Sequence, residues 1–323
     1  MNKRERVLAA MNLQPVDRPP VGFWFHFLAE QGVGDACVKA HLDYYNTIDV
    51  DMVKIMCDSY FDYPNPVAKA VKEPADWYAM KPLGKDHPFI YEQVARAKAV
   101  REGLKDDMVV IYNVFAPFSL IRFGVGDELV MDHLKKDPAA IAYALEVIAQ
   151  DCCLLSELLV TEAGIDGIYY CVQGGEKNRF TPEYYREHIT PTDKKVLEHA
   201  NKFSTTNVLH CCGWAGIPNN MEIWQDYPAK VFNWAVFVEG LDLDDGRWFA
   251  GGRTTLGGFE THWDGTVQEG VIYHGTKEEL QDYTRNLILN HGKLGLMLGG
   301  DCTIDAKLDW ERIRWIIEAA RSI

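Results

Sequence analysis

Eight short apolar runs, separated by longer helical patterns, constrain the fold of this 323-residue chain more than any other feature. Most of these runs are almost continuously apolar and rich in Val, Ile, Phe and Tyr, which is typical of parallel strands covered on both faces. The eight strands that we expect are Val21–His26, Val50–Cys57, Met108–Phe115, Gly167–Gln173, Asn207–Cys212, Val231–Val236, Thr254–Phe259 and Gly295–Gly300. Strands that alternate with helices predict an α/β fold with a parallel sheet.

The segments between the runs carry helical signals. Apolar residues recur at helical spacing in the helix expected over residues 138–163. Thr276 and Glu279 form a capping-box pattern, and Pro182 follows Thr181 as it would at the first position of a helix. The helices that we expect cover residues 138–163, 182–203, 276–290 and 308–323.

Eight strands with helical crossovers predict a closed (β/α)₈ TIM barrel, built as a single domain over residues 1–323. A doubly wound open sheet is the alternative, but no G-x-G-x-x-G motif follows an early strand, which disfavours it. Residues 1–15 and about 27–48 are expected as an N-terminal helical extension that decorates the barrel. Residues 58–107 are expected as a long excursion over its mouth.

The net charge of −14 disfavours nucleic acid and anionic membrane surfaces as partners, because both attract basic proteins. We see no signal peptide behind the charged first residues and no apolar run near the 18 residues that a membrane span needs. We therefore expect a cytoplasmic protein. Its eight cysteines should then be thiols, metal ligands or core residues rather than disulfides.

Polar side chains gather where the expected strands end, which is where α/β barrels place their chemistry. Two carboxylates, Glu260 and Asp301, follow the last two expected strands and are our candidates for catalytic residues. Each could bind a metal directly or form a hydrogen bond to a residue that does. The side chains that we expect to contact the substrate are His26, Asp58, Asn113, Gln173, Asn233 and Trp234.

The strongest local signal is the pair His210 and Cys212 in a single expected strand. Residues two apart in a strand point to the same face, so an imidazole and a thiolate would share one side and form half of a zinc site. Cys302, which follows two glycines at the end of the last strand, would complete it. The competing interpretation is that these cysteines only pack in the core. Core packing is what we expect of Cys37, Cys152, Cys153 and Cys171.

Several segments resemble the uroporphyrinogen decarboxylase superfamily, and together they cover nearly the whole chain. The opening run Arg4–Met11, followed by Pro15–Val21, is similar to the start of that family. Further similarity lies in Gln173–Glu176, Thr181–Tyr185, Leu209–Gly213 and Gly300–Thr303. The resemblance implies a (β/α)₈ barrel with N-terminal helical additions, in agreement with the strand pattern.

The superfamily divides by chemistry. Its true decarboxylases carry an Arg-rich segment after the first strand for the porphyrinogen carboxylates, whereas Gly22–Phe27 contains no Arg. The other branch contains zinc-dependent corrinoid methyltransferases, such as the methylcobamide:coenzyme M methyltransferases. Their zinc is held by His-x-Cys and a distant Cys, which His210, Cys212 and Cys302 match. The resemblance implies Zn²⁺ and a cobalamin-binding corrinoid protein as partner.

The expected activity is exchange of a methyl group between the corrinoid protein and a small molecule, with a zinc-activated thiol as the expected acceptor. One alternative is corrinoid-dependent demethylation of a methoxy or other methylated donor. Uroporphyrinogen decarboxylation and a non-catalytic zinc-binding accessory role are further alternatives.

Overall fold

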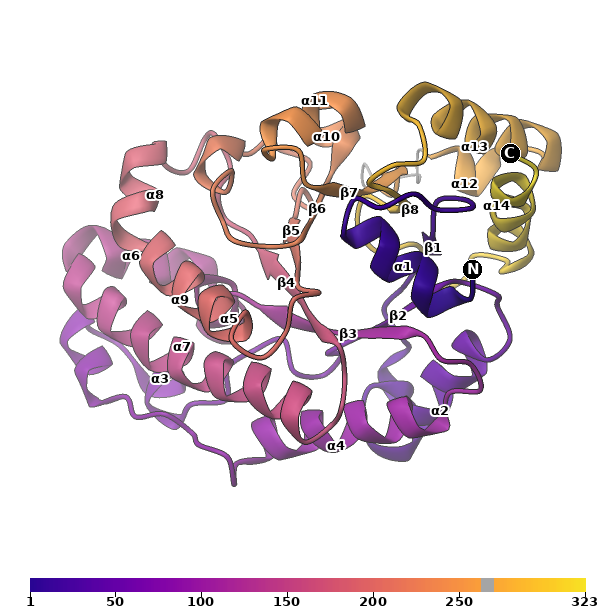
Figure 1. Cartoon of the computed structure of the whole chain (residues 1–323). Coiled ribbons are helices and arrows are strands. Elements are labelled where there is room, and N and C mark those ends of the chain that lie inside the picture. The colour runs from indigo at the N-terminus through magenta and orange to yellow at the C-terminus, as the bar shows by residue number, and fades with distance from the viewer. Residues whose placement is uncertain (263–269) are drawn as a thin grey trace.

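A computed structural model describes residues 1–262 and 270–323, and it confirms the (β/α)₈ barrel (Figure 1). The strands are β1 (Val21–Gly22), β2 (Met52–Ile55), β3 (Val109–Phe115), β4 (Gly167–Val172), β5 (Val208–Cys211), β6 (Val231–Trp234), β7 (Thr254–Phe259) and β8 (Leu296–Gly300). Their hydrogen-bonded order is β1-β8-β7-β6-β5-β4-β3-β2, and all seven pairs are parallel. Each expected run contains one observed strand, and most of the observed strands lack a few residues at one or both ends of the run.

The barrel closes between β1 and β2 through Asp51. The Asp51 backbone N–H donates to the Val21 carbonyl (2.8 Å), while the Val21 N–H donates to the Asp51 carboxylate (2.8 Å). This carboxylate is fully buried and also accepts hydrogen bonds from Arg6 (2.7 Å) and Arg18 (2.6 Å). The N-terminal segment is thereby tied to the seam of the barrel by charge-assisted hydrogen bonds.

Helices surround the strands in Figure 1 and supply most of the crossovers. Those expected at 138–163, 276–290 and 308–323 are present, with ends shifted by up to three residues. The helices are α1 (Lys3–Met11), α2 (Gly34–Tyr45), α3 (Pro66–Ala70), α4 (Pro88–Gly103), α5 (Pro117–Val125), α6 (Asp127–Lys136), α7 (Pro138–Thr161), α8 (Pro182–His188), α9 (Thr190–Ala200), α10 (Val236–Glu239), α11 (Leu243–Phe249), α12 (Val271–His274), α13 (Lys277–His291) and α14 (Glu311–Arg321), with short 3₁₀ turns at Ala29–Gln31, Pro74–Ala79 and Met221–Ile223.

Three expectations about helices need correction. Helix α2 is the crossover from β1 to β2, so residues 27–48 do not merely decorate the barrel. Helix α4 is the crossover from β2 to β3, so part of the excursion expected over residues 58–107 belongs to the outer layer of the barrel. The helix expected over 182–203 is two helices, α8 and α9, which meet at Ile189. Pro191 accounts for this break, because its ring lacks an N–H and clashes with the carbonyl four residues earlier in a continuous helix.

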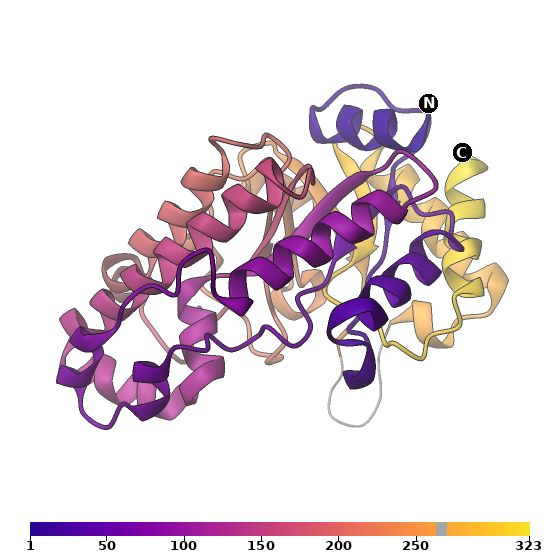
Figure 2. The same cartoon turned by 90° about the horizontal axis from the view of Figure 1, so that it is seen from below.

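Helix α1 covers the end of the barrel where the strands begin (Figure 2). Its residues Val7, Ala10 and Met11 are buried against apolar side chains that point into the barrel from the strands. Those side chains are Met52, Val109, Ile111, Tyr169, Val208, Val231, Leu256 and Met297. The expected N-terminal helix therefore has a structural role, since it seals the barrel at this end.

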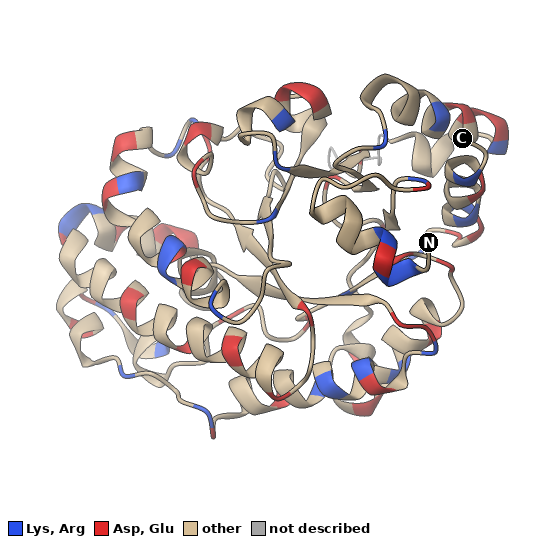
Figure 3. Ribbon diagram, viewed as in Figure 1, with Lys and Arg blue, Asp and Glu red and all other residues tan. Residues whose placement is uncertain are grey.

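Helix α7 is the one described helix that is long and apolar enough to cross a membrane by length and composition alone. Its most apolar 18-residue window is 67% buried, and the helix packs against α4, α5, α6 and α9. It is thus a core helix of the barrel. Figure 3 shows acidic residues on most of the outer helices, interspersed with basic ones. The cytoplasmic location stays a prediction.

Replacing Asp51 with Ala should destabilise the protein by about 3–5 kcal/mol, because Arg18 would keep a buried charge without its counterion and Arg6 would retain only its pair with the more exposed Asp17. Denaturant unfolding of the two proteins measures this difference. The matched control is Asp49→Ala, which removes an exposed carboxylate paired with Lys3 and Arg321 and should cost about 1 kcal/mol or less. Equal losses in the two variants would contradict the role of Asp51 in barrel closure.

Candidate metal centre

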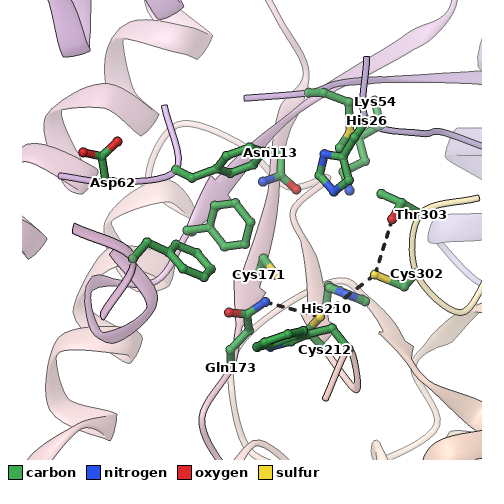
Figure 4. A pocket seen from close by; sticks show the side chains of 15 residues that line it. His26, Lys54, Asp62, Asn113, Cys171, Gln173, His210, Cys212, Cys302 and Thr303 are labelled. Atoms are coloured by element: carbon green, nitrogen blue, oxygen red, sulfur yellow. Dashed lines mark hydrogen bonds between the residues drawn. The ribbon is translucent and has the colours of Figure 1, made fainter. Parts of the chain in front are cut away.

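A cavity of about 520 Å³ opens at the end of the barrel where the strands finish (Figure 4). Its walls come mainly from inward-pointing side chains on β2 to β5 and from the segments that follow the strands. The residues that line it are His26, Lys54, Met56, Phe61, Asp62, Asn113, Phe115, Phe123, Cys171, Gln173, His210, Cys212, Trp214, Cys302 and Thr303. This is the end at which barrel enzymes place their active sites.

Soft metal-binding side chains meet in this cavity. The ligand atoms of Cys171, His210 and Cys212 all lie within 4.8 Å of one another, and all three residues are buried. The Cys302 sulfur lies 4.0 Å from the Cys212 sulfur. Two thiolates bound to one tetrahedral zinc at about 2.3 Å are separated by roughly 3.8 Å, so this spacing fits a shared ion. Imidazole and sulfur donors without a carboxylate form a set that suits zinc.

Cys171 belongs to this cluster, which corrects the expectation that it packs in the core. It lies beside His210 in the register of β4 and β5. Because residues two apart in a strand share a face, Tyr169, Cys171 and Gln173 all point into the barrel. The run from 167 to 173 is apolar on both faces, so its pattern alone does not reveal which residues point inward.

Asn233 fixes the orientation of His210. The Asn233 side-chain nitrogen donates to the carbonyls of Leu256 (2.6 Å) and Gly300 (3.3 Å), so its oxygen faces His210 and accepts a hydrogen bond from His210 Nδ1. The Tyr169 hydroxyl donates to the same oxygen (2.5 Å). With the proton on Nδ1, the lone pair on Nε2 is left to bind a metal.

The two thiols in contact are held in their protonated form when no metal is bound. The neighbouring Cys171 sulfur raises the pKa of Cys212 to about 12, although Cys302 and a hydrogen bond from the Gln173 amide (3.4 Å) act in the opposite direction. Contact with Cys212 and burial raise the pKa of Cys302 to about 12. Metal binding must therefore displace a proton from each thiol.

Lys54 is a cavity residue that the sequence analysis missed. Its ammonium group lies 3.6 Å from the centre of the Tyr169 ring and 4.7 Å from that of Trp24, and the residue is only 3% exposed. Burial lowers the pKa of Lys54 to about 8, although the nearby thiols act in the opposite direction. The sequence signal that could have identified Lys54 is that it is the one charged residue in the otherwise apolar strand β2.

The family model for uroporphyrinogen decarboxylase (URO-D) matches residues 2–323 of this chain. The chain belongs to the uroporphyrinogen decarboxylase family. Among solved structures, a methyltransferase from Methanosarcina mazei superposes with a TM-score of 0.73 at 15% identity, covering 100% of this chain and 99% of that one. At this identity the likeness shows a shared fold.

Two further structures are less similar. A B12-independent methionine synthase from Shewanella sp. W3-18-1 gives a TM-score of 0.44 at 14% identity, covering 71% of this chain and 65% of that one. Xylanase B from Clostridium stercorarium F9 gives a TM-score of 0.46 at 10% identity, covering 94% of this chain and 90% of that one. Comparison with curated proteins gives no match.

Three of the six side chains expected to contact substrate line the cavity of this family member, namely His26, Asn113 and Gln173. Asp58 does not line it. Its buried carboxylate pairs with His26 Nδ1 (2.8 Å) and accepts from the Phe27 N–H (2.9 Å), so it positions His26. Asn233 likewise acts behind the cavity wall, through His210.

Trp234 lies in the outer core, so the prediction that it contacts substrate is wrong. It follows Asn233 in β6 and therefore points to the opposite face of the strand. Its indole N–H donates to the Leu241 carbonyl (2.8 Å), and its ring packs against Phe232 with centroids 5.1 Å apart. The ring lies so close to Gly246 that a side chain there would collide with it.

The two candidate carboxylates lie outside the cluster of metal-binding side chains. The buried Asp301 carboxylate accepts from the N–H groups of Gly258 and Phe237 (3.3 Å each), and burial raises its pKa well above the usual range. It lines a second cavity of about 170 Å³ that Cys302 also borders. Glu260 follows β7 and is not among the described residues that line the main cavity. The structure thus does not bring either carboxylate to the cluster as a ligand.

Metal binding should become tighter as the pH rises, because the thiols of Cys212 and Cys302 must lose their protons. Zinc added to the metal-free protein in weakly buffered solution near neutral pH should release at least one proton from each. Cys212→Ser should release one proton fewer, whereas Cys153→Ser, a buried thiol on α7, should behave as the unmodified protein. Binding without proton release would contradict thiolate ligation.

Asn233→Leu should weaken zinc binding by about 10–100-fold, since His210 would lose the acceptor that fixes its tautomer and orientation. Competition with a coloured chelator measures the affinity. The matched control is Asn113→Leu, because the Asn113 amide donates to the Cys57 sulfur (3.0 Å) and not to His210. An equal effect of the two substitutions would argue against the orienting role.

Proposed function

We propose that this member of the uroporphyrinogen decarboxylase family is a zinc-dependent methyltransferase. It would move a methyl group between a corrinoid carried by a partner protein and a small molecule, with a thiol as acceptor. The observation that carries the proposal is the convergence of His210, Cys212 and Cys302, joined by Cys171, in a cavity at the catalytic end of the barrel. The fold shared with a methyltransferase along the full length of both chains supports it.

The side chains present fit the ion. His210, Cys212 and Cys302 would be its ligands, and Cys171 offers a further sulfur within reach of the first two. Zinc held there would lower the pKa of a substrate thiol, so that its sulfur is a nucleophile at neutral pH. The Gln173 amide donates to the Cys212 sulfur and would draw charge from that ligand.

Aromatic side chains form one wall of the cavity. Phe61, Phe115 and Phe123 pack edge to face, with ring centroids 5.2–6.4 Å apart, and all three line the cavity. Trp214 lines it as well, although 58% of its surface is exposed. With a ligand bound, this apolar wall would reduce the access of competing water to the reacting methyl group.

Methyl transfer to a thiol forms a sulfur–carbon bond from a sulfur lone pair and breaks the bond between the methyl carbon and its donor. The donor keeps the electron pair of the broken bond, which is the role of the corrinoid in this proposal. The cavity opens at the end of the barrel away from α1, so the methyl donor would approach from that side.

Demethylation of a methoxyaromatic compound is a second candidate, which the three phenylalanine rings favour because they offer an apolar wall to an aromatic ring. The decarboxylation of uroporphyrinogen is disfavoured. Among the described residues that line the cavity, Lys54 is the only Lys or Arg, whereas that substrate carries many carboxylates.

The test combines metal analysis with two assays. The purified protein should contain about one zinc per chain and should consume methylcobalamin in the presence of thiols. His210→Ala, Cys212→Ser and Cys302→Ser should each lose most of the zinc and lower the rate by about 100-fold or more, whereas Cys153→Ser should retain both. The second assay mixes cob(I)alamin with methoxyaromatic compounds, and turnover only there would assign the reverse direction.

Equal zinc content in all variants would refute the ligand assignment. An intact zinc site with no methyl transfer from any corrinoid donor would favour a non-catalytic accessory role instead.

A further inference from the structure

We propose that Cys171 is a fourth protein ligand of the zinc, so that side chains alone complete the coordination until a substrate sulfur takes the place of the Cys171 sulfur. This inference rests on the proposed function and deepens it, because it states how the site is closed when no substrate is bound. Catalytic zinc sites keep an open position beside three protein ligands, whereas closed sites have four. Three observations support the proposal, namely the position of Cys171, the choice of ligands in the cavity and the charge of the site.

The first observation is that strand pairing brings Cys171 to the other ligands. Cys171 lies beside His210 in the register of the parallel strands β4 and β5, and both side chains line the cavity. The Cys171 sulfur, a ring nitrogen of His210 and the Cys212 sulfur lie within 4.8 Å of one another. Donor atoms on one tetrahedral zinc are roughly 3.5–3.8 Å apart, so a shift of about 1 Å lets all three share an ion.

Cys171 also differs from the buried cysteines that only pack. The Cys57 sulfur accepts a hydrogen bond from a side-chain amide (3.0 Å), and the Cys152 and Cys153 sulfurs each approach a backbone carbonyl (3.9 Å). Within residues 1–262 and 270–323 the Cys171 sulfur has no amide or carbonyl partner and meets the Cys212 sulfur instead. Surroundings made of other metal-binding side chains indicate a ligand rather than a packing residue.

The second observation is that the cavity offers the ion no better fourth ligand. Among the described residues that line it, Asp62 is the one carboxylate; it pairs with Lys69 (3.8 Å), and Figure 4 shows it apart from the sulfurs. The Gln173 amide presents its nitrogen to the Cys212 sulfur (3.4 Å), so its oxygen points away from that ligand. The Cys171 thiolate is therefore the donor that remains, and it is of the soft type that zinc accepts.

The third observation is the charge of the cavity. Zn²⁺ with three thiolates and a neutral imidazole carries one negative charge, and a buried charge needs a counterion. Lys54 is buried in the wall of the same cavity, and the sulfurs of Cys302, Cys171 and Cys212 act on its ammonium electrostatically. The cavity thus supplies the positive charge that a site with three thiolates requires, whereas a site with two thiolates is already neutral.

The consequence is a site that opens only for a competing sulfur. When a substrate thiol takes the position of Cys171, it gives its proton to the departing Cys171 sulfur, and one bound thiolate replaces another. The number of sulfur ligands and the charge of the site stay the same. Water and carboxylates are harder ligands and would not displace a thiolate from this soft set, so the closed site selects for thiols.

The experiment counts sulfur ligands before and after addition of 2-mercaptoethanol, by X-ray absorption on the zinc protein and by the thiolate charge-transfer band of the cobalt(II)-substituted protein. The unmodified protein should show three sulfurs in both states, because the added thiol replaces Cys171. Cys171→Ala should show two and gain a third with the thiol, so its charge-transfer band should rise by about half. The matched control is Cys211→Ala, because Cys211 lies between His210 and Cys212 but faces away from the barrel interior; it should behave as the unmodified protein.

A second measurement is the zinc affinity, by competition with a coloured chelator. Cys171→Ala should bind zinc about 10–100-fold more weakly than the unmodified protein, because one of four ligands is lost, and Cys211→Ala should not. Two sulfurs that become three when the thiol is added to the unmodified protein, or an unchanged affinity in Cys171→Ala, would overturn the inference while leaving the proposed function with its other three ligands. Failure of the unmodified protein to bind zinc or cobalt would overturn both. Counting sulfurs in the unmodified protein needs no substitution, so it decides the matter even if Cys171→Ala does not fold.

Discussion

The structure depends on closure of the barrel at the seam between β1 and β2. Strand β1 has only two residues, so its backbone provides little pairing, and the buried carboxylate of Asp51 completes the link between the strands. Arg6 and Arg18 hold that carboxylate from the N-terminal segment. Because closure forces alternate side chains inward, residues as distant in sequence as Cys212 and Cys302 share one space.

Much of this arrangement follows from the sequence, and the exceptions have physical causes. The shared face of His210 and Cys212 follows from the two-residue period of a strand, and the glycines before Cys302 identify the end of the last strand. The same period does not orient a strand that is apolar on both faces, so Cys171 was assigned to the core and Trp234 to the site. Tertiary packing decides which face of such a strand points inward, and the sequence of one strand does not reveal it.

The charge inside the cavity differs in sign from the net charge of the whole protein. The protein carries a net charge of −14, and Figure 3 shows acidic residues on the outer helices, yet the cavity at the barrel mouth is lined by the buried ammonium of Lys54. Salt screens the outer charges over roughly 8 Å at physiological ionic strength, whereas a buried group is screened much less. The local cation therefore dominates the field that a bound ligand experiences, while the acidic exterior mainly favours solubility.

The seal that α1 makes with Val7, Ala10 and Met11 has a kinetic consequence. Among the described residues, α1 leaves only the opposite end of the barrel for access to the cavity, so in the proposed methyl transfer a small reactant and a bulky methyl carrier would share that entrance. In that proposed reaction the small reactant would have to enter first, and its product would leave only after the carrier has withdrawn. Steady-state turnover would then follow a compulsory order, and excess carrier would slow it by trapping the product inside.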